Sequence, residues 1–345
     1  MEIKKILIPN KPHLDPLAAI YLLKQYGKEK FPGIDSAEII FWENSHDLKL
    51  EDIDKFKSEK ILSIDIGGGL FDHHKSLEKE TVADLVAAYL GIEKNPELIA
   101  LLNYIREDDL EGLHNRYGDL AYLIKCFHKQ NLPSLKVVEL GLRLINYFQT
   151  SQIDWHYQVK KEYENKIKIY KIKRFDKKLK IGVVESDNSQ LANYGLTMDS
   201  LSAVVQKHST GQIMILTNKH HRLNLREIVA AIRMRELELS GYNKPIDPAK
   251  LQFEGKNSLI TNWFYHRSLN AFLNGSEALN KAEPTKLKFS EIVSFVWNGL
   301  SSEHSEYYWV GLEEVDNYSY SELRNSTKLS DIIKNAFDKN SRYER

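Results

Sequence analysis

Cysteine is almost absent from this 345-residue chain, which also lacks an excess of charge of either sign and a long apolar run. Each of these absences excludes a class of protein or site. The single cysteine, Cys126, excludes an intramolecular disulfide bond and a cysteine-rich zinc site, which suits a reducing compartment. Lysine plus arginine equals aspartate plus glutamate at 48 each, so bulk charge does not imply nucleic-acid binding, although a local basic patch stays open. No run approaches the roughly 18 apolar residues of a membrane span, and the start lacks a signal-peptide pattern. We therefore expect a cytoplasmic protein without membrane contact.

Strand-like and helical patterns alternate over the first 125 residues or so. The strand-like runs are "IKKILIP", "AEIIFW" and "KILSID". The runs with the apolar spacing of helices are "PLAAIYLLKQYG", "TVADLVAAYLG" and "PELIALLNYIRED". This alternation predicts a parallel sheet covered by helices on both faces, in which ligands bind beyond the carboxyl ends of the strands.

The later sequence predicts a second domain. Residues from Gly118 to about Arg174 have an almost continuous helical pattern that ends in a lysine- and glutamate-rich stretch. A solvated helix that joins two domains explains this stretch more simply than a stripe that follows phosphates. Beyond it come strand-like and helical runs again, with "STG" as a hairpin turn. We expect an α/β protein with an amino-terminal domain at 1–150, a helical linker at 151–175 and a smaller α/β domain at 176–345.

The glycine-rich stretch "SIDIGGGLFDHH" (63–74) allows two kinds of site. "DIGGGLFD" resembles the phosphate-binding loop of the actin, hexokinase and Hsp70 ATPases, where glycines let the backbone approach nucleotide phosphates. The first strand of that fold leads into an aspartate-glycine hairpin, however, and here it leads into "PNKPHLDPLAA", which has no glycine. The ATPase interpretation is therefore the weaker one.

The stronger interpretation uses the side chains of the same stretch. Acidic and histidine side chains follow the first and third strand-like runs, at His13, Asp15, Asp65, Asp72, His73 and His74. "REDDLEG" adds Asp108 and Asp109 where a helix ends. Imidazole together with several carboxylates favours manganese, with magnesium as the alternative. The sequence thus predicts a divalent metal site at the edge of the first sheet.

The order of these motifs resembles the DHH phosphoesterases, above all the MYG-type (melanocyte-proliferating-gene) nucleases. The resemblance rests on "HLDPLAAIYLL", "SIDIGGGLFDHHKS" and "REDDLEG", and more loosely on "WFYHRSLNAFLNGS" in the second domain. It implies that Asp65 bridges two metal ions and that His73 is a ligand. Asp72 would orient that histidine or add a carboxylate, and His74 would face the substrate phosphate as a donor or acid.

The resemblance also assigns the remaining positions of the first domain. His13 and Asp15 correspond to the first motif, and Asp109 or its neighbour Asp108 to the last acidic ligand. The leading histidine of the family's first motif falls on Pro9 here, with only Asn10 and Lys11 nearby. This departure makes weak activity, or none, an open alternative.

In the second domain the resemblance implies a substrate site, with the domain closing over its ligand. Its candidate residues are His266, Arg267, Asn274 and Gly275. We expect a phosphodiesterase that hydrolyses nucleic acid ends, short oligonucleotides or a nucleotide signal through two-metal activation of water. The alternative is a regulatory module that binds nucleotide or nucleic acid and has lost one metal. The sequence leaves open whether the chain forms a homodimer.

Overall fold

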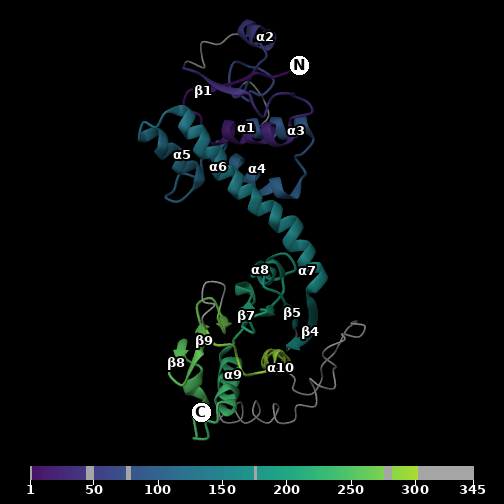
Figure 1. Ribbon diagram of the computed structural model, residues 1–345, viewed down its shortest axis with the longest axis vertical. Coiled ribbons are helices and arrows are strands. Elements are labelled where there is room, and N and C mark those ends of the chain that lie inside the picture. The colour runs from purple at the N-terminus through teal and green to yellow at the C-terminus, as the bar shows by residue number, and fades with distance from the viewer. Residues whose placement is uncertain (1, 44–49, 75–78, 175–176, 276–281, 302–345) are drawn as a thin grey trace. The chain divides into compact units, whose positions relative to one another are not determined.

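The computed structural model describes residues 2–43, 50–74, 79–174, 177–275 and 282–301 (Figure 1). Contacts divide the chain into two units, Met1–Tyr157 and Gln158–Arg345, and each unit has its own apolar core. The part of the predicted second domain beyond residue 301 lies outside the described residues.

Unit 1 contains a parallel sheet of three strands in the order β2-β1-β3. The strands are β1 (Lys5–Pro9), β2 (Glu38–Trp42) and β3 (Ile61–Ser63). The helices are α1 (Leu14–Tyr26), α2 (Leu50–Ser58), α3 (Val82–Leu90), α4 (Pro96–Asp109), α5 (Leu120–Lys129) and α6 (Ser134–Ile153). The prediction of an amino-terminal parallel sheet with flanking helices is confirmed.

The alternation of β1 distributes its side chains between two apolar layers. Ile6 and Ile8 join the main core, which α1 fills along nearly its whole length. Leu7 points to the other face and packs with Ile66 beside the aromatic pair Trp42 and Phe56. This is the pattern of a buried parallel strand, whose two faces are both covered by helices.

Unit 2 contains a mixed sheet in the order β4-β5-β6-β7-β10-β9-β8, in which β5 and β6 pair in parallel and the other neighbours pair antiparallel. The strands are β4 (Lys168–Arg174), β5 (Lys177–Glu185), β6 (Ala203–Lys207), β7 (Ile213–Thr217), β8 (Gly255–Asn257), β9 (Ile260–His266) and β10 (Ala271–Leu273).

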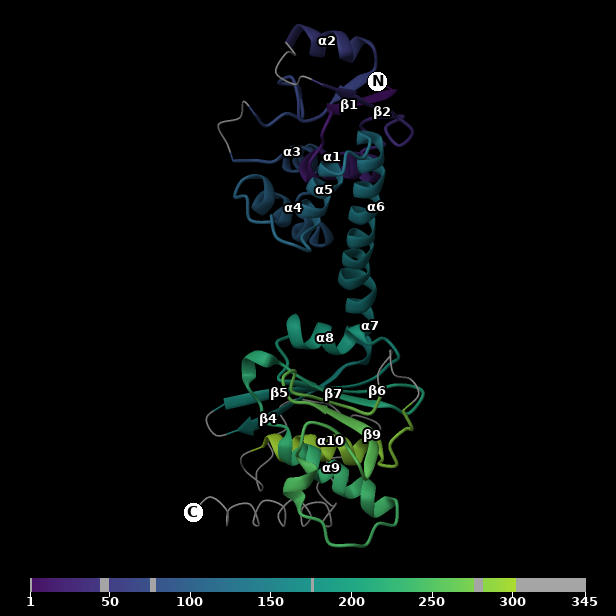
Figure 2. The ribbon, with the colours of Figure 1, turned by 90° about the vertical axis from the view of Figure 1, so that its left-hand side faces the viewer.

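The helices of unit 2 cover both faces of this sheet. They are α7 (Lys160–Lys166), α8 (Gln190–Thr197), α9 (Arg226–Leu239) and α10 (Phe289–Leu300), with 3₁₀ turns η3 (Lys219–His221) and η4 (Pro248–Leu251). Figure 2 shows α8 on one face, and α9 and α10 on the other. Between α6 and α7 the stretch η2 (Asp154–Val159) is π-helical.

The helical pattern that we expected up to Arg174 ends earlier, at Lys166. Residues Lys168–Arg174 form the edge strand β4 instead. Along β4 the buried residues Tyr170 and Ile172 alternate with exposed lysines, which is a period of two and not of 3.6. The lysines made the segment look like the end of a solvated helix, whereas the pairing partner β5 decides its conformation.

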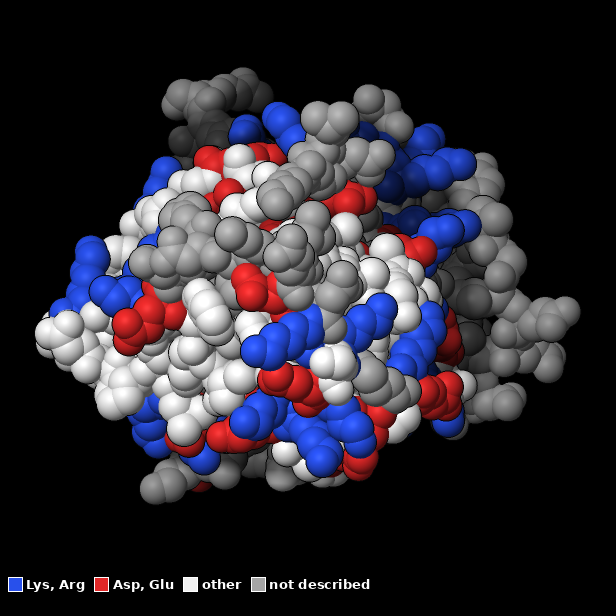
Figure 3. Space-filling view, turned by 90° about the horizontal axis from the view of Figure 1, so that it is seen from above, with Lys and Arg blue, Asp and Glu red and all other residues white. Residues whose placement is uncertain are grey.

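None of the described helices is both long and apolar enough to span a membrane. On the face that Figure 3 shows, the basic and acidic side chains of the described residues are interspersed. This distribution agrees with the equal numbers of basic and acidic residues in the sequence.

Candidate metal centre

Three segments of unit 1 bring acidic and histidine side chains together at the carboxyl edge of the sheet. His13 and Asp15 lie where β1 passes into α1, and Asp65 follows β3. Because β1 and β3 are parallel neighbours, the segments that follow them leave the same edge of the sheet. The end of α4 contributes Asp109.

These side chains form two groups, each able to place three ligand atoms around one ion. One group is Asp65, His73 and His74, and the other is His13, Asp15 and Asp109; within each group the ligand atoms lie within 4.8 Å of one another. The groups adjoin. His73 Nε2 lies 3.8 Å from Asp109 Oδ2, and His13 Nδ1 lies 3.9 Å from Asp65 Oδ2.

Asp65 occupies the centre of this arrangement. Its side chain is 2% exposed, and its backbone has φ +63°, a left-handed conformation that is uncommon for any residue except glycine. Oδ1 is buried without a hydrogen-bond partner, and it lies 3.5 Å from His73 Nε2 and 3.6 Å from His74 Nδ1. A buried carboxylate oxygen without a hydrogen-bond partner is costly, and a bound cation would offset that cost.

His73 is oriented by the backbone of a neighbouring segment. Its Nδ1 donates a hydrogen bond to the carbonyl oxygen of Glu80 at 2.8 Å, which leaves Nε2 facing Asp65. An imidazole held in this way by a backbone carbonyl is the usual arrangement of a metal-ligating histidine. In the absence of metal, the contact with the Asp65 carboxylate raises the pKa of His73 to about 9.

His13 and Asp109 form the closest pair of the second group, with Nε2 3.0 Å from Oδ1. Burial disfavours the charged imidazole, but Asp109 and the nearby carboxylates outweigh burial and raise the pKa of His13. Burial likewise opposes ionisation of Asp109, yet the hydrogen bond from His13 and the nearby histidines lower its pKa below the usual value. The surrounding charges therefore favour a cation at this position.

The glycine loop orients Asp72 rather than leaving its backbone open to a phosphate. Gly67 and Gly68 have φ +75° and +70°, and the Gly68 N–H donates to Asp72 Oδ2 at 2.6 Å. The other oxygen, Oδ1, lies 2.7 Å from His74 Nδ1. Burial opposes the ionisation of Asp72, but the hydrogen bonds from Gly68 and His74 outweigh burial and lower the pKa of Asp72. Asp72 thus fixes the half-exposed ring of His74.

Asp15 anchors a helix as well as adding a carboxylate to the cluster. Its two oxygens accept the backbone N–H groups of Val82 and Ala83, the first residues of α3, at 2.7 and 2.8 Å. Burial is the main cause that raises the pKa of Asp15 to about 7. No local sequence pattern indicates this contact, because Asp15 and Val82 are 67 residues apart.

Of the two neighbouring acidic candidates at the end of α4, only Asp109 faces the cluster. The buried carboxylate of Asp108 lies 3.3 Å from Lys125 Nζ on α5. Successive residues of a helix point about 100° apart, so these two aspartates face different directions. The sequence left this choice open, and helix geometry decides it.

The position of the family's leading histidine is occupied by Pro9, the last residue of β1. Asn10 follows it, and its side-chain oxygen accepts a hydrogen bond from Ser134 Oγ at 3.0 Å. A histidine that we had not singled out, His128 of α5, lies 2.8 Å from the carbonyl oxygen of Pro12. His128 is outside both metal-binding groups found among the described residues.

In unit 2 the four candidate substrate residues fall into different environments. Arg267 is exposed in the turn between β9 and β10, and His266 Nδ1 lies 3.1 Å from Ser268 Oγ. Asn274 is fully buried: its amide donates to Asn262 and Glu283 and accepts from the Thr285 N–H. Gly275 has φ +83° beside Gln212. Asn274 and Gly275 thus shape the end of β10, while Arg267 is open to a ligand.

Comparisons with known proteins add little to this picture. No protein-family model matches the chain, and no curated protein is similar to it. A crystal structure of an uncharacterized protein from Helicobacter pylori G27 is similar, with 13% identity over 86% of this chain and 99% of that chain, at a TM-score of 0.26. A TM-score this low supports no statement about fold or function.

Proposed function

We propose that this chain is a metal-dependent phosphoesterase of the DHH type, which hydrolyses nucleic acid ends, short oligonucleotides or a nucleotide signal. Asp65 carries this proposal. One of its carboxylate oxygens lies near His73 and His74, without a hydrogen-bond partner, and the other faces His13. A carboxylate that stands between two groups of ligands is suited to bridge two divalent ions.

The donor set fits manganese best, with magnesium as the alternative. Three imidazoles accompany the carboxylates, and no cysteine takes part. Asp65 would bridge, His73 and solvent would complete one ion's ligands, and His13, Asp15 and Asp109 would hold the other. Such ions, when bound, lower the pKa of water and offset charge on a phosphate.

His74 and Asp72 are the candidates for contact with the substrate. The side chain of His74 is 61% exposed, whereas that of Asp72 is buried beneath it. Asp72 accepts a hydrogen bond from His74 Nδ1–H, which leaves Nε2 to accept a hydrogen bond in the neutral ring or, in the imidazolium form, to donate a proton to a phosphate oxygen or a leaving group. Gly68 in turn fixes Asp72, which gives the pair a set geometry.

A second candidate function is that of a binding or regulatory module that retains the fold with one weakly held metal. Pro9 favours it, since a proline side chain offers no ligand atom where the family has a histidine.

Hydrolysis of short single strands separates the two functions. The full chain would be incubated with Mn²⁺ and five-nucleotide RNA or DNA, or with a dinucleotide, and released mononucleotides would be measured with and without a chelator. The phosphoesterase releases mononucleotides, and the chelator stops this release. Asp65→Asn abolishes it, while Asp119→Asn, a half-buried control outside the acidic and histidine groups, retains it. Binding of these ligands without release would instead identify the regulatory module.

A further inference from the structure

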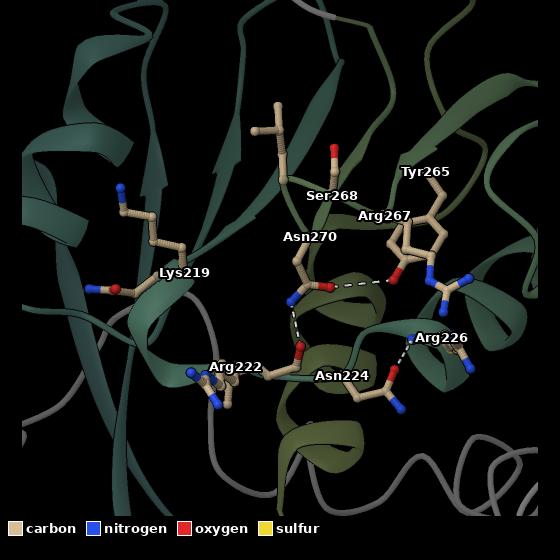
Figure 4. Close-up of a pocket in the computed structure, with 11 residues that line it drawn as sticks. Lys219, Arg222, Asn224, Arg226, Tyr265, Arg267, Ser268 and Asn270 are labelled. Carbon is tan, nitrogen blue, oxygen red and sulfur yellow. Dashed lines mark hydrogen bonds between the residues drawn. The ribbon is translucent and has the colours of Figure 1, made fainter.

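A second concentration of charge lies entirely within unit 2, around a pocket of about 440 Å³. One wall is the segment from β7 to the start of α9, and the other is the turn between β9 and β10. The basic residues that line it are Lys219, Arg222, Arg226 and Arg267. Figure 4 shows the first two on one side of Asn270 and the other two across from them.

The four cations of this pocket have no acidic counterpart in its lining. No aspartate or glutamate contributes to the walls, and in the described part of the chain none forms an ion pair with any of the four. The nearby Glu254 accepts a hydrogen bond from the backbone N–H of Arg267. Four like charges around one cavity repel one another, and a bound anion removes that repulsion.

The walls of the pocket are held in place before any ligand arrives. The Asn270 amide donates to Thr217 Oγ1 at 2.9 Å and to the Leu223 carbonyl at 2.5 Å, which ties the β9–β10 turn to the segment before α9. The Tyr265 hydroxyl donates a hydrogen bond to Asn270 Oδ1 at 3.3 Å. Asn270 and Arg222 both have φ +48°; asparagine adopts this left-handed conformation more readily than other residues with a side chain, and Arg222 adopts it where η3 ends.

We propose that this pocket binds the phosphate group of a nucleotide or of an oligonucleotide end. Guanidinium groups form paired hydrogen bonds with phosphate oxygens, and three arginines exceed what a single carboxylate needs. The volume falls in the range of pockets that hold small organic ligands, which leaves room for a sugar next to the phosphate. The choice of a nucleotide ligand rests on the proposed function, whereas the choice of phosphate rests on the pocket itself.

The test measures binding without metal, so that it does not depend on hydrolysis. The full chain, in a chelator, is titrated with a labelled five-nucleotide strand that carries either a 5′-phosphate or a 5′-hydroxyl, and fluorescence anisotropy reports binding. Competition with a mononucleotide and with inorganic phosphate then identifies the source of the phosphate. We expect the phosphorylated strand to bind at least about tenfold more tightly than the hydroxyl strand, because one charge-assisted contact has about that effect.

Two double variants distinguish the pocket from general attraction. Arg222→Gln/Arg267→Gln removes two charges at the pocket, and Lys171→Gln/Lys178→Gln removes two exposed charges on β4 and β5. The first should weaken binding of the phosphorylated strand about 10–100-fold and retain Mn²⁺ binding, and the second should change it less than about threefold. Arg267→Gln alone, in an exposed turn, should show part of the effect even if the double variant unfolds.

The outcomes separate this inference from the proposed function. Asp65→Asn should bind the phosphorylated strand as the parent does, although it no longer hydrolyses it. A mononucleotide that competes as well as the strand supports the pocket and identifies a free nucleotide as its ligand. The inference is overturned if both double variants weaken binding equally, or if the parent does not distinguish the phosphate from the hydroxyl.

Discussion

At the scale of single residues, the neighbouring histidines His73 and His74 have different hydrogen-bond partners. His73 is held by the Glu80 carbonyl and directs Nε2 at Asp65, whereas His74 is half-exposed and held by Asp72. The same dipeptide thus supplies one imidazole for the buried cluster and one for the surface. The two rings contact each other, and different partners, the Glu80 carbonyl and the Asp72 carboxylate, hold them.

This difference leads to a prediction for two alanine variants. His73→Ala should weaken Mn²⁺ binding at least about tenfold, since it removes a ligand of the buried group. His74→Ala should leave most Mn²⁺ binding intact and slow turnover about 10²–10⁴-fold, the usual contribution of a positioned acid or base. Calorimetry and single-turnover hydrolysis measure the two effects. Equal loss of metal in both variants would contradict this division.

The end of α4 offers a matched pair of variants. Asp109→Asn should weaken Mn²⁺ binding at least about tenfold, because the Asp109 carboxylate faces His13 and His73. Asp108→Asn should leave it within about threefold, because the Asp108 carboxylate pairs with Lys125 instead. Calorimetric titration compares the two. The reverse order of affinities would show that Asp108 is the ligand.

Metal binding should depend on pH through His73. Its pKa is raised to about 9, so at neutral pH the imidazole is mostly protonated and Mn²⁺ must displace that proton. The apparent affinity should therefore rise by up to about tenfold per pH unit between about pH 6 and 8. Titrations in buffers of different ionisation enthalpy would count the released protons. An affinity that does not change over this range would be inconsistent with ligation by His73 Nε2.

At the scale of elements, some of the candidate metal ligands also hold the helices of unit 1 together. Asp15 is the second residue of α1 and also accepts hydrogen bonds from the first N–H groups of α3. Asp84 of α3 forms a capping box with Thr81 and pairs with Arg106 of α4. The helices that present Asp15 and Asp109 are thus joined by buried or half-buried polar contacts, which hold the candidate ligands at fixed separations.

Removal of the Asp15 contacts should lower the stability of the fold. Asp15→Ala leaves two buried N–H groups of α3 without an acceptor, which should lower the free energy of unfolding by roughly 2–4 kcal/mol. Glu93→Ala, which removes an exposed carboxylate ahead of α4, should change it by less than about 0.5 kcal/mol. Urea unfolding in a chelator measures both. A similar stability for the two variants would exclude an anchoring function for Asp15.

At the scale of the whole chain, the two candidate sites lie in different units with separate cores. A ligand stabilises the unit that binds it, by an amount that grows with the logarithm of its concentration. Mn²⁺ at about 100 times its dissociation constant should therefore stabilise unit 1 by about 2.7 kcal/mol. Calorimetric scans should show a shift of one unfolding transition and not of the other. An equal shift of both would show that the units unfold together.

Much of unit 1 could be predicted from the sequence, because its signals are local. The strand-like runs and apolar spacing gave β1, β2, β3 and the helices α1, α3 and α4, and strand ends indicated where ligands gather. The clusters around His13 and Asp65 follow from parallel pairing of β1 with β3, which the alternation of strands and helices already implies. Residue types next to strand ends therefore determined most of the candidate metal centre.

The remaining features depend on contacts between residues far apart in the sequence, which no local pattern encodes. Tertiary packing decided that Asp109 and not Asp108 faces His13, that Asp15 holds α3, and that β4 is a strand. It also placed the segment from Lys219 to Arg226 opposite Arg267, although some 40 residues separate them. The sequence alone determined which side chains could bind a metal or a phosphate; only the folded chain decided which of them meet, because their spacing is set by strand pairing and helix direction.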